Sequence, residues 1–377
     1  MTLRLPADLL PTDGRFGAGP TKVRREALEA LGQAHDLIGT SHRQRPVKSL
    51  VASVKERLSA LHSAPEGYQV VLGNGGSTLF WDVAVCSLIE RRSAHGVFGE
   101  FSRKFADAAA RAPFLTEPLL TEAEPGSIAL PEASDEVDVY AWAQNETSTG
   151  AHAPVVRPAG ARDDQLVLID ATSAAGGLAA DLSKTDVHYF APQKNLASDG
   201  GLWLAFCSPA ALERSARLTT DLPGGRWVPD SLNLTVAATN SVADQTLNTP
   251  AIATLFLLDH HLGWLLDNGG LDFATARTRE SSEIVYSWAD NHALATPFVT
   301  NPEHRSPVVA TIDFADEVDA AALAKQLRAQ GIVDVEPYRK LGRNQLRIAC
   351  YTAIDPEDVA RLTRCIDWLL EQPDLNA

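Results

Sequence analysis

Lys194 stands immediately after a short apolar run and before a polar turn, in the segment HYFAPQKNLASDGG of residues 188–201. A second apolar run, GLWLAFCS, follows soon after it. Most other lysines of the chain stand in polar, helical or loop surroundings, where a strongly hydrated ammonium group stays in water. A lysine at the end of a predicted strand indicates a chemical role, because a lysine tuned by its site can act as a nucleophile and as a proton carrier.

Three other loops follow predicted strands and carry groups that could take part in chemistry. The segment LGNGGSTLFWD, residues 72–82, places a glycine cluster directly before a helix, where backbone N–H groups can approach a phosphate. Asp170 follows the apolar run of LVLIDATSAAGG, and Thr147 offers a hydroxyl in NETSTG. Taken singly, the three loops also fit a tight turn, a capping carboxylate and a polar turn.

The glycine loop matches neither of the common nucleotide-binding patterns. No lysine follows it, as a Walker A loop requires, and after Gly73 and Gly75 the last position of a dinucleotide fingerprint holds Thr78. Considered together, however, the four loops supply a phosphate cup, a carboxylate, hydroxyl donors and a lysine. This set meets the needs of pyridoxal 5′-phosphate, whose phosphate, ring nitrogen and aldehyde require these groups. Phe101 could provide an aromatic face against the ring, although a core phenylalanine is the default for such a residue.

The elements that must position these loops alternate short β-like runs with helical patterns over the first two-thirds of the chain. This alternation predicts an α/β fold, with a mostly parallel sheet and helices on both faces. In such a sheet, binding residues collect past the carboxyl ends of the strands. The run Gly201–Phe206 follows Lys194 too closely for a crossover helix, so we expect it to be antiparallel. Leu115–Asp135 shows no regular pattern and is expected to be an irregular excursion.

The pattern changes near residue 255. Two consecutive helices are expected at Ile252–Leu266 and Leu271–Asn291, followed by a strand–helix–strand–helix series. The last helix has a strong start signal, with Asp355 as N-cap and Pro356 at its first position. We therefore predict a large domain over residues 1–255 and a smaller α/β domain over residues 256–377.

Composition limits the class of protein. The 377 residues are 45% hydrophobic, and 33 basic against 48 acidic side chains give a net charge of −15. This charge disfavours nucleic acid or an anionic membrane as partner, but is compatible with a small anionic substrate in a local basic pocket. No run approaches the ~18 apolar residues of a membrane span, and no secretory h-region is present, so we expect a cytoplasmic protein. The cysteines lie in apolar runs without metal-ligand or redox spacing, so buried thiols and no metal are expected: Cys86, Cys207, Cys350 and Cys365.

Over nearly its whole length the chain resembles the phosphoserine aminotransferases, pyridoxal-phosphate enzymes of fold type I in the class V aminotransferase group. The resemblance is carried by FGAGPTKV, GTSHRQRP, the glycine loop, NETSTG, LIDATS, APQKN, LNTP and YRKLGRNQLRIA, in the order of the family. It implies a seven-stranded type of large-domain sheet, a homodimer with shared active sites, and reversible amino transfer between L-glutamate and 3-phosphohydroxypyruvate. The products are O-phospho-L-serine, for serine biosynthesis, and 2-oxoglutarate. A side activity on 3-hydroxy-2-oxo-4-phosphooxybutanoate, in pyridoxine biosynthesis, is also implied.

The resemblance assigns a role to each cofactor-binding position. These are the Schiff base for Lys194, cofactor contact for Gln193, the ring nitrogen for Asp170, the ring hydroxyl side for Thr147, the phosphate for Ser77 and Thr78, ring stacking for Phe101, and the phosphate from the neighbouring subunit for Asn248 and Thr249.

Substrate binding is predicted for four basic residues. Arg347 lies in the apolar strand NQLRIACY, where an unpaired guanidinium is costly to bury, so we expect it to clamp the α-carboxylate of both substrates. We expect Arg43 and Arg339, supported by His42, to bind the end of the substrate that differs between the two half-reactions. This end is a phosphate in one half-reaction and the glutamate side-chain carboxylate in the other. The resemblance implies that His42 and Arg43 come from the partner subunit. The sequence departs from the family at Phe101, often tryptophan, and at Tyr338, often histidine, in a loop two residues longer.

Three alternative functions fit parts of this pattern. A cysteine desulfurase-like lyase of the same fold needs a reactive cysteine on a mobile loop and usually a histidine before the lysine, where this chain has Gln193. A nicotinamide oxidoreductase is disfavoured because the glycine loop does not match the dinucleotide fingerprint. The loop also follows at least one helix, whereas a Rossmann unit has its glycine loop at the first βα turn. A scaffold that has lost its chemistry is disfavoured by the presence of Lys194 and Asp170.

Overall fold

The large sheet dominates the computed structural model, which describes residues 3–220, 226–373 and 375. It is seven-stranded, and its spatial order is β1 (Gln69–Asn74), β9 (Leu202–Cys207), β8 (Val187–Phe190), β7 (Leu166–Asp170), β4 (Val139–Ala143), β2 (Ser93–Val97) and β3 (Leu119–Glu122). β9 runs antiparallel to both of its neighbours, and the other adjacent pairs are parallel. The predicted fold class and the antiparallel β9 are confirmed.

The prediction for Leu115–Asp135 is wrong in part. This segment contains β3, which pairs in parallel with β2 at the edge of the sheet. The strand has only four residues, and they alternate between half-buried and exposed. A short edge strand needs no continuous apolar run, so its pattern is too weak to be distinguished from a loop.

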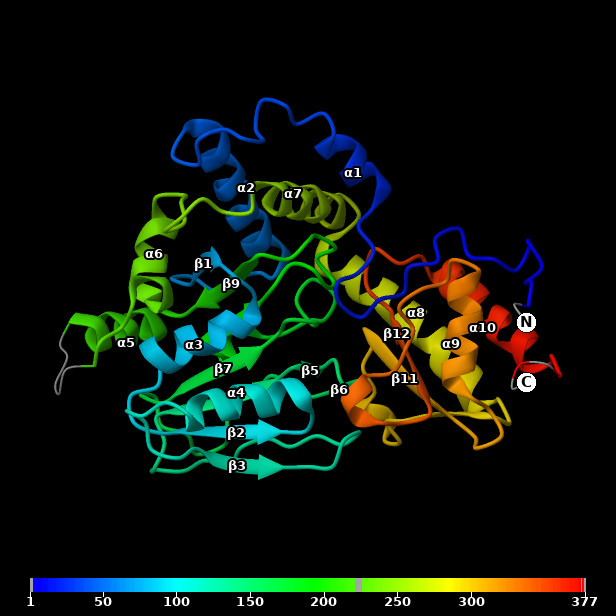
Figure 1. Ribbon diagram of the computed structural model, residues 1–377. Helices are drawn as coiled ribbons and strands as arrows, with labels where there is room; N and C mark the ends of the chain where they lie inside the picture. The colour runs from blue at the N-terminus through cyan, green and yellow to red at the C-terminus, as the bar shows by residue number, and fades with distance from the viewer. Residues whose placement is uncertain (1–2, 221–225, 374, 376–377) are drawn as a thin grey trace.

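Helices cover both faces of the large sheet because its central strands are apolar on both sides of the pleat. Leu204 packs with α2 (Arg45–Leu61) and α7 (Ile252–Asp267), which lie side by side (Figure 1). The next residue, Ala205, faces the opposite helical layer. That layer comprises α3 (Ser77–Ser87), α4 (Glu100–Ala110), α5 (Pro209–Thr220) and α6 (Leu234–Val242). The short α1 (Arg25–Leu31) contacts α7.

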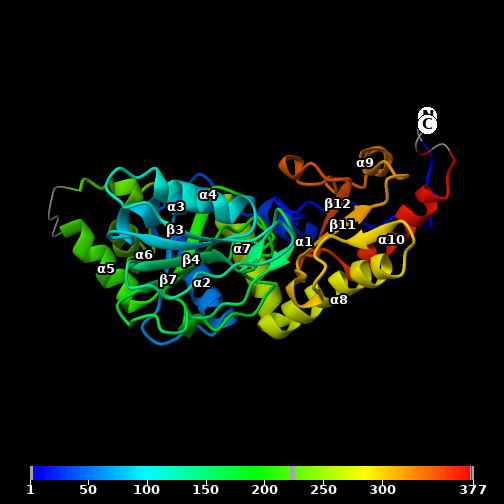
Figure 2. The ribbon, with the colours of Figure 1, turned by 90° about the horizontal axis from the view of Figure 1, so that it is seen from below.

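The C-terminal part contains its own antiparallel sheet. Its strands are β10 (Ala295–Pro297), β11 (Val309–Phe314) and β12 (Gln345–Ala349), and its helices are α8 (Gly270–Asp290), α9 (Ala320–Ala329) and α10 (Pro356–Leu370). Asp355 caps α10 as predicted, because its side chain accepts the N–H of Glu357. Figure 2 shows the two sheets at opposite ends of an elongated molecule.

The parallel strands direct their carboxyl ends toward the C-terminal part, as the arrowheads of β2, β3 and β7 show (Figure 1). A small hairpin, β5 (Asn145–Glu146) with β6 (Ala151–His152), lies at this edge. The Thr311 hydroxyl of β11 donates to the carbonyl of Thr149 within the hairpin turn. Four one-turn helices complete the regular structure of the described residues: η1 (Leu182–Lys184), η2 (Asp230–Leu232), η3 (Pro302–His304) and η4 (Arg339–Leu341). No helix among these residues is long and apolar enough to cross a membrane.

Candidate active site

A cavity of about 250 Å³ opens at the carboxyl edge of the large sheet. The parallel strands β4, β7 and β8 end there, so their following loops meet although they are distant in sequence. The cavity is lined by all the cofactor residues that the strand-end loops predicted, namely Ser77, Thr78, Phe101, Thr147, Asp170, Gln193 and Lys194. The structure therefore brings this part of the predicted set together within one chain.

Lys194 is buried, with 8% of its surface exposed, and its Nζ donates to the carbonyl oxygen of Ala18 at 2.7 Å. Burial, followed by the positive charge of Arg347, lowers its pKa to about 7. The negative charges of Asp170 and Glu146 oppose that shift. A much larger fraction of this amine is therefore deprotonated at neutral pH than of an ordinary lysine.

Asp170, at the end of β7, has both carboxylate oxygens in hydrogen bonds. Oδ1 accepts the backbone N–H of Thr172 at 2.9 Å and its hydroxyl at 2.5 Å. Oδ2 accepts the hydroxyl of Tyr189 at 3.1 Å, and Trp81 Nε1 donates to that hydroxyl at 3.0 Å. Burial raises the pKa of Asp170, while the bonds from Thr172 and Tyr189 act in the opposite direction. The carboxylate is therefore fixed in position at the cavity wall.

The start of α3 provides a site for an anion beside this carboxylate. Gly76 is the N-cap, and Ser77 and Thr78 form the first turn. The first N–H groups of a helix lack partners within it and lie at its positive end, which suits a phosphate. Ser77 Oγ also lies 2.6 Å from Thr172 Oγ1, so α3 is joined to the Asp170 loop by a chain of hydroxyls. This geometry favours a phosphate-binding loop over a simple tight turn at residues 72–82.

The polar atoms of the cavity wall are only partly hydrogen-bonded within the described part of the chain. Thr147 Oγ1 and Asn145 Nδ2 both donate to Ser173 Oγ at 2.8 Å. In contrast, Asn145 Oδ1 and Gln193 Oε1 are buried without a hydrogen bond in the described part of the chain. An unsatisfied buried polar group costs about 1–3 kcal/mol, so such atoms are expected where a bound molecule completes them. The donor set, the anion site and the buried amine fit pyridoxal phosphate.

Glu146 is a site residue that the sequence did not predict. It is fully buried and accepts the backbone N–H groups of Phe101 and Ser102, the latter at 2.9 Å. These bonds satisfy the N-terminus of α4 and orient Phe101, whose ring centroid lies 5.7 Å from Lys194 Nζ. The signal was present in NETSTG, where an acidic residue directly precedes Thr147.

Glu146 itself does not line the cavity, but five residues that do were also missed, namely Gly19, Gly76, Trp81, Asn145 and Thr172. A glycine is required at position 19, both by its backbone conformation and by the close approach of Lys194. It has a left-handed backbone, φ +136°, and a Cβ there would lie 2.3 Å from Lys194 Nζ. Trp81 resembles an ordinary core residue of an apolar helix, so no sequence signal distinguished it.

Arg347 reaches the site from the second sheet. Its Nη1 donates to the carbonyl of Thr147 at 3.2 Å, whereas its Nε is buried without a partner among the described residues. Its guanidinium carbon lies 5.4 Å from the ring centroid of Tyr338, which meets Phe101 edge-on at 5.9 Å. Burial lowers the pKa of Arg347, in keeping with its position on an apolar strand. The side chain has donors available for an anion.

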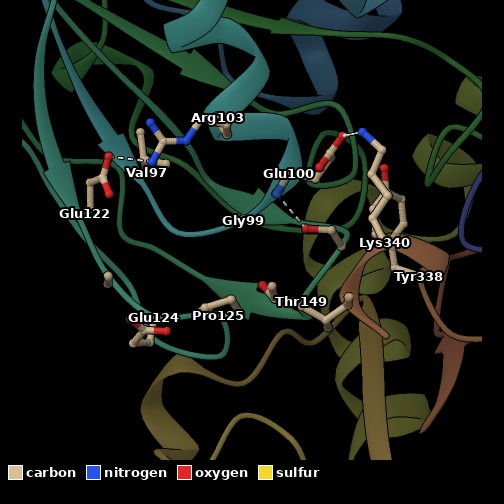
Figure 3. Close-up of a pocket in the computed structure, with 13 residues that line it drawn as sticks. Val97, Gly99, Glu100, Arg103, Glu122, Glu124, Pro125, Thr149, Tyr338 and Lys340 are labelled. Atoms are coloured by element: carbon tan, nitrogen blue, oxygen red, sulfur yellow. Dashed lines mark hydrogen bonds and ion pairs between the residues drawn. The ribbon is translucent and has the colours of Figure 1, made fainter. Parts of the chain in front are cut away.

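Tyr338 also borders a second cavity, of about 350 Å³, shown in Figure 3. Lys340 Nζ lies 2.5 Å from the carboxylate of Glu100, and Arg103 pairs with Glu122 at 2.5 Å. The first of these pairs attaches η4 to the start of α4. Arg339 is exposed in η4 and does not line either of these two cavities.

The remaining predicted residues form a separate group in the single chain. His42 Nδ1 lies 3.1 Å from Thr249 Oγ1, and Arg43 Nη1 donates to Gln245 at 2.7 Å. None of His42, Arg43, Asn248 and Thr249 lines the cavity of Lys194. They do lie together, so they could act as one unit on another molecule.

Two further kinds of site receive no support. No group of three or more histidine, cysteine or acidic side chains suited to a metal occurs within the described ranges. Cys207, Cys350 and Cys365 are buried and Cys86 is half-buried, so the expectation of buried thiols is confirmed for three of them. Burial raises the pKa of Cys365 to about 11 and of Cys350 to about 12. These thiols are poor nucleophiles, unlike the reactive cysteine of a desulfurase.

Comparison with known proteins agrees with this geometry. Residues 124–335 match the model of the aminotransferase class-V family. The phosphoserine aminotransferase of Nocardioides sp. (strain ATCC BAA-499 / JS614) is 58% identical over 371 residues, which cover 98% of each chain. The structure of a phosphoserine aminotransferase from Cytophaga hutchinsonii superposes with a TM-score of 0.86 at 20% identity, covering 95% of this chain and 99% of that one. A pyridoxal-phosphate-bound phosphoserine aminotransferase from Trichomonas vaginalis gives 0.79 at 20% identity, covering 94% and 99%.

The fold and the site define a pyridoxal-phosphate-dependent transaminase. Within that class, the chain belongs to the phosphoserine aminotransferases of the class-V aminotransferase family. The predicted family, fold and cofactor are confirmed, and the nicotinamide oxidoreductase is excluded.

Proposed function

We propose that the protein catalyses reversible amino transfer between L-glutamate and 3-phosphohydroxypyruvate, giving O-phospho-L-serine and 2-oxoglutarate, in the cytoplasm. The observation that carries this proposal is the grouping of Lys194, Asp170 and Arg347 at one sheet edge. Arg347 is close enough for its charge to lower the pKa of Lys194. An amine available near neutral pH, a fixed carboxylate and a guanidinium with free donors are the groups that amino transfer from an α-amino acid requires.

Pyridoxal phosphate, when bound, supplies an aldehyde that condenses with amines and a ring that delocalises the electrons of the substrate α-carbon. For this chain we infer that Ser77 and Thr78 bind its phosphate and that Phe101 stacks on its ring. Asp170 holds a negative charge for the ring nitrogen, and Thr147 and Gln193 bind its polar edge. The unsatisfied Gln193 Oε1 and Asn145 Oδ1 support this assignment, since each needs a donor.

Lys194 acts as nucleophile and as proton carrier in this proposal. With a pKa of about 7, its Nζ can accept a proton from the substrate α-carbon and return it, at little cost in either direction. The Ala18 carbonyl holds the amine at a defined point, because it accepts a hydrogen from Nζ and leaves the nitrogen lone pair available. Burial under Gly19 and Phe101 limits the access of water to the same atom.

Arg347 binds the α-carboxylate that glutamate and phosphoserine share, because a guanidinium can form two parallel hydrogen bonds with a carboxylate. The ends that differ, a phosphate and a side-chain carboxylate, are assigned to Arg339 and to His42 and Arg43 of a second copy. A homodimer with shared sites follows from this assignment, with Asn248 and Thr249 also reaching the cofactor phosphate of the other copy. Its support is the exposed cluster that joins His42 to Thr249, away from the cavity of its own chain.

The same chemistry extends to 3-hydroxy-2-oxo-4-phosphooxybutanoate, which we propose as a second substrate, in pyridoxine biosynthesis. Like 3-phosphohydroxypyruvate, it has a 2-oxo carboxylate group at one end and a phosphate at the other. Arg347 and the residues assigned to the substrate phosphate would therefore bind both compounds.

The test is to incubate purified, cofactor-loaded protein with L-glutamate and 3-phosphohydroxypyruvate and to measure 2-oxoglutarate. Lys194→Ala is the negative control, and pyruvate and oxaloacetate are comparison substrates without phosphate. We expect the phosphorylated keto acid to have the highest kcat/KM. A higher kcat/KM for a keto acid without phosphate would contradict the proposed substrate.

A further inference from the structure

A third cavity, lined mainly by basic side chains among its charged residues, is separate from the cavity of Lys194. It has a volume of about 560 Å³ and is lined by residues of the segment before and within α1, of α7 and α8, and of the loop before α10. Five arginine or lysine side chains line it, against three aspartate or glutamate side chains. The positive excess holds for the lining itself, because Glu29 and Asp358, which lie within ion-pair distance of Arg25 and Lys22, are not part of it.

Two guanidinium groups share one aromatic ring in this cavity. The guanidinium carbon of Arg24 lies 4.2 Å above the centroid of Trp264, and that of Arg277 lies 5.8 Å from the same centroid. Burial lowers the pKa of Arg24, Glu26 opposes that shift, and the positive charge of Arg277 adds to it. Arg24 Nη1 is buried and has no hydrogen-bond acceptor in the described part of the chain. A buried donor on a guanidinium that faces another cation calls for an anion.

Lys22 adds a third cation, whose ammonium group has N–H donors that neither nearby carboxylate reaches. Its side chain is only 14% exposed, yet the carboxylates within ion-pair range, of Asp13 and Asp358, lie 3.7 and 3.9 Å away, beyond hydrogen-bond distance. Asp13 is already engaged by the guanidinium of Arg15, at 2.6 and 2.9 Å. The ammonium group is therefore attracted to this region without being saturated.

We propose that this cavity binds a small phosphate-bearing anion through Lys22, Arg24 and Arg277. The three cations come from separate positions around the cavity, and a tetrahedral oxyanion can accept from several directions at once, whereas a planar carboxylate is matched by a single guanidinium. Glu26 and Asp355 pair with Arg24 and Arg277 at 3.2 Å, so they compete with the ligand and keep its affinity moderate. These rim carboxylates also disfavour an extended polyanion.

The cavity is connected to the two segments that hold Lys194. Arg277 Nε donates to the carbonyl of Thr352 at 2.8 Å, and the Thr352 hydroxyl donates to the carbonyl of Asn195. On the other side, Lys22 and Arg24 follow closely after Ala18, whose carbonyl accepts the amine of Lys194. An anion in the cavity would stabilise both segments, so its occupancy bears on the geometry of the lysine.

The test is titration calorimetry of cofactor-loaded enzyme with inorganic phosphate at constant ionic strength. We expect saturable binding that Arg24→Gln and Lys22→Gln each weaken by about tenfold or more, because each removes a charge-assisted hydrogen bond. Lys22→Gln is the milder change, since Lys22 has no close hydrogen-bonded carboxylate to leave unpaired. Arg162→Gln is the matched control, because Arg162 pairs with Asp135 at 2.7 Å on the exposed surface.

Arg43→Gln separates this site from the proposed substrate-phosphate site. We expect it to leave the phosphate binding that depends on Arg24 unchanged. Three results would overturn the proposal: no saturable binding, equal affinity in Arg24→Gln, Lys22→Gln and the unaltered enzyme, or a loss confined to Arg43→Gln. The proposal does not rest on the proposed function, because none of these results depends on turnover.

Discussion

The amine of Lys194 donates a hydrogen bond to the carbonyl oxygen of Ala18, which lies 2.7 Å away and 176 positions earlier in the chain. Gly19 permits this contact, since any side chain there would collide with the amine. The contact fixes the position of Nζ, and burial brings its pKa to about 7.

Lys194→Ala should bind pyridoxal phosphate without a covalent link, because the cavity keeps its anion site and Asp170. We expect turnover to fall by at least about 10²–10⁴-fold, the usual contribution of a positioned acid–base group, since the nucleophile is lost as well. Borohydride reduction followed by mass spectrometry measures the link. A stable cofactor adduct on the Lys194→Ala chain would show that another residue is the nucleophile.

Attachment of the cofactor to cofactor-free protein should depend on pH with an apparent pKa of about 7. Only the neutral amine is nucleophilic, so the rate should rise with pH below that value and level off above it. An ordinary lysine would show a rise that continues to about pH 10. Stopped-flow absorbance at several pH values checks this prediction, and a rate still rising through pH 9 would contradict it.

Asp170→Asn should keep the fold and much of the cofactor affinity but transaminate poorly, because a neutral amide no longer favours a protonated ring nitrogen. Tyr189→Phe removes the 3.1 Å bond to Asp170 and also the 3.0 Å bond that the hydroxyl accepts from Trp81. We expect the loss of the Asp170 bond to cost about 0.5–1.5 kcal/mol, up to roughly tenfold in rate.

The measurement is kcat together with the pH dependence of the bound cofactor's visible absorbance. Tyr140→Phe is the matched control, because Tyr140 is equally buried in the same sheet but bonds to Ser134 and Gln165. If Tyr140→Phe and Tyr189→Phe change the absorbance profile equally, the effect of Tyr189 is structural. Near-normal turnover in Asp170→Asn would reduce Asp170 to a capping carboxylate.

Arg347→Lys should impair reaction with glutamate and phosphoserine alike, because both carry the α-carboxylate and an ammonium cannot reproduce the paired bonds of a guanidinium. Arg339→Ala should slow phosphoserine more than glutamate, since a dianion loses more than a monoanion. Single-turnover reaction with each amino acid separately distinguishes the two variants. Equal losses for both donors in Arg339→Ala would remove Arg339 from phosphate recognition.

Chains with Lys194→Ala should regain activity when mixed with chains altered to alanine at Asn248 and Thr249. In a mixed dimer with shared sites, one of the two sites draws an intact lysine from one chain and intact phosphate ligands from the other. Activity after subunit exchange is the measurement, and each variant incubated alone is the control. Absence of rescue, with exchange verified by mass spectrometry, would indicate a site built within one chain.

The strand-end residues were predictable for a general reason. Parallel strands end at one edge of their sheet whatever the details of packing, so Asp170, Thr147 and Lys194 had to meet once the strands before them were recognised. The cap of α10 by Asp355 was predictable because it depends on neighbouring residues alone. β3 was not, because a short, half-exposed edge strand has little periodicity of its own.

The sequence by itself therefore determined the α/β class, the family and the groups gathered at the sheet edge, all of which depend on local pattern and order. Only the tertiary structure decided what those groups are able to do. The pKa of Lys194 depends on burial and on Arg347, a residue of the other sheet, while Glu146 and Trp81 gained their roles from partners distant in the chain. Burial and charge proximity are set by long-range packing, and no local sequence pattern encodes them.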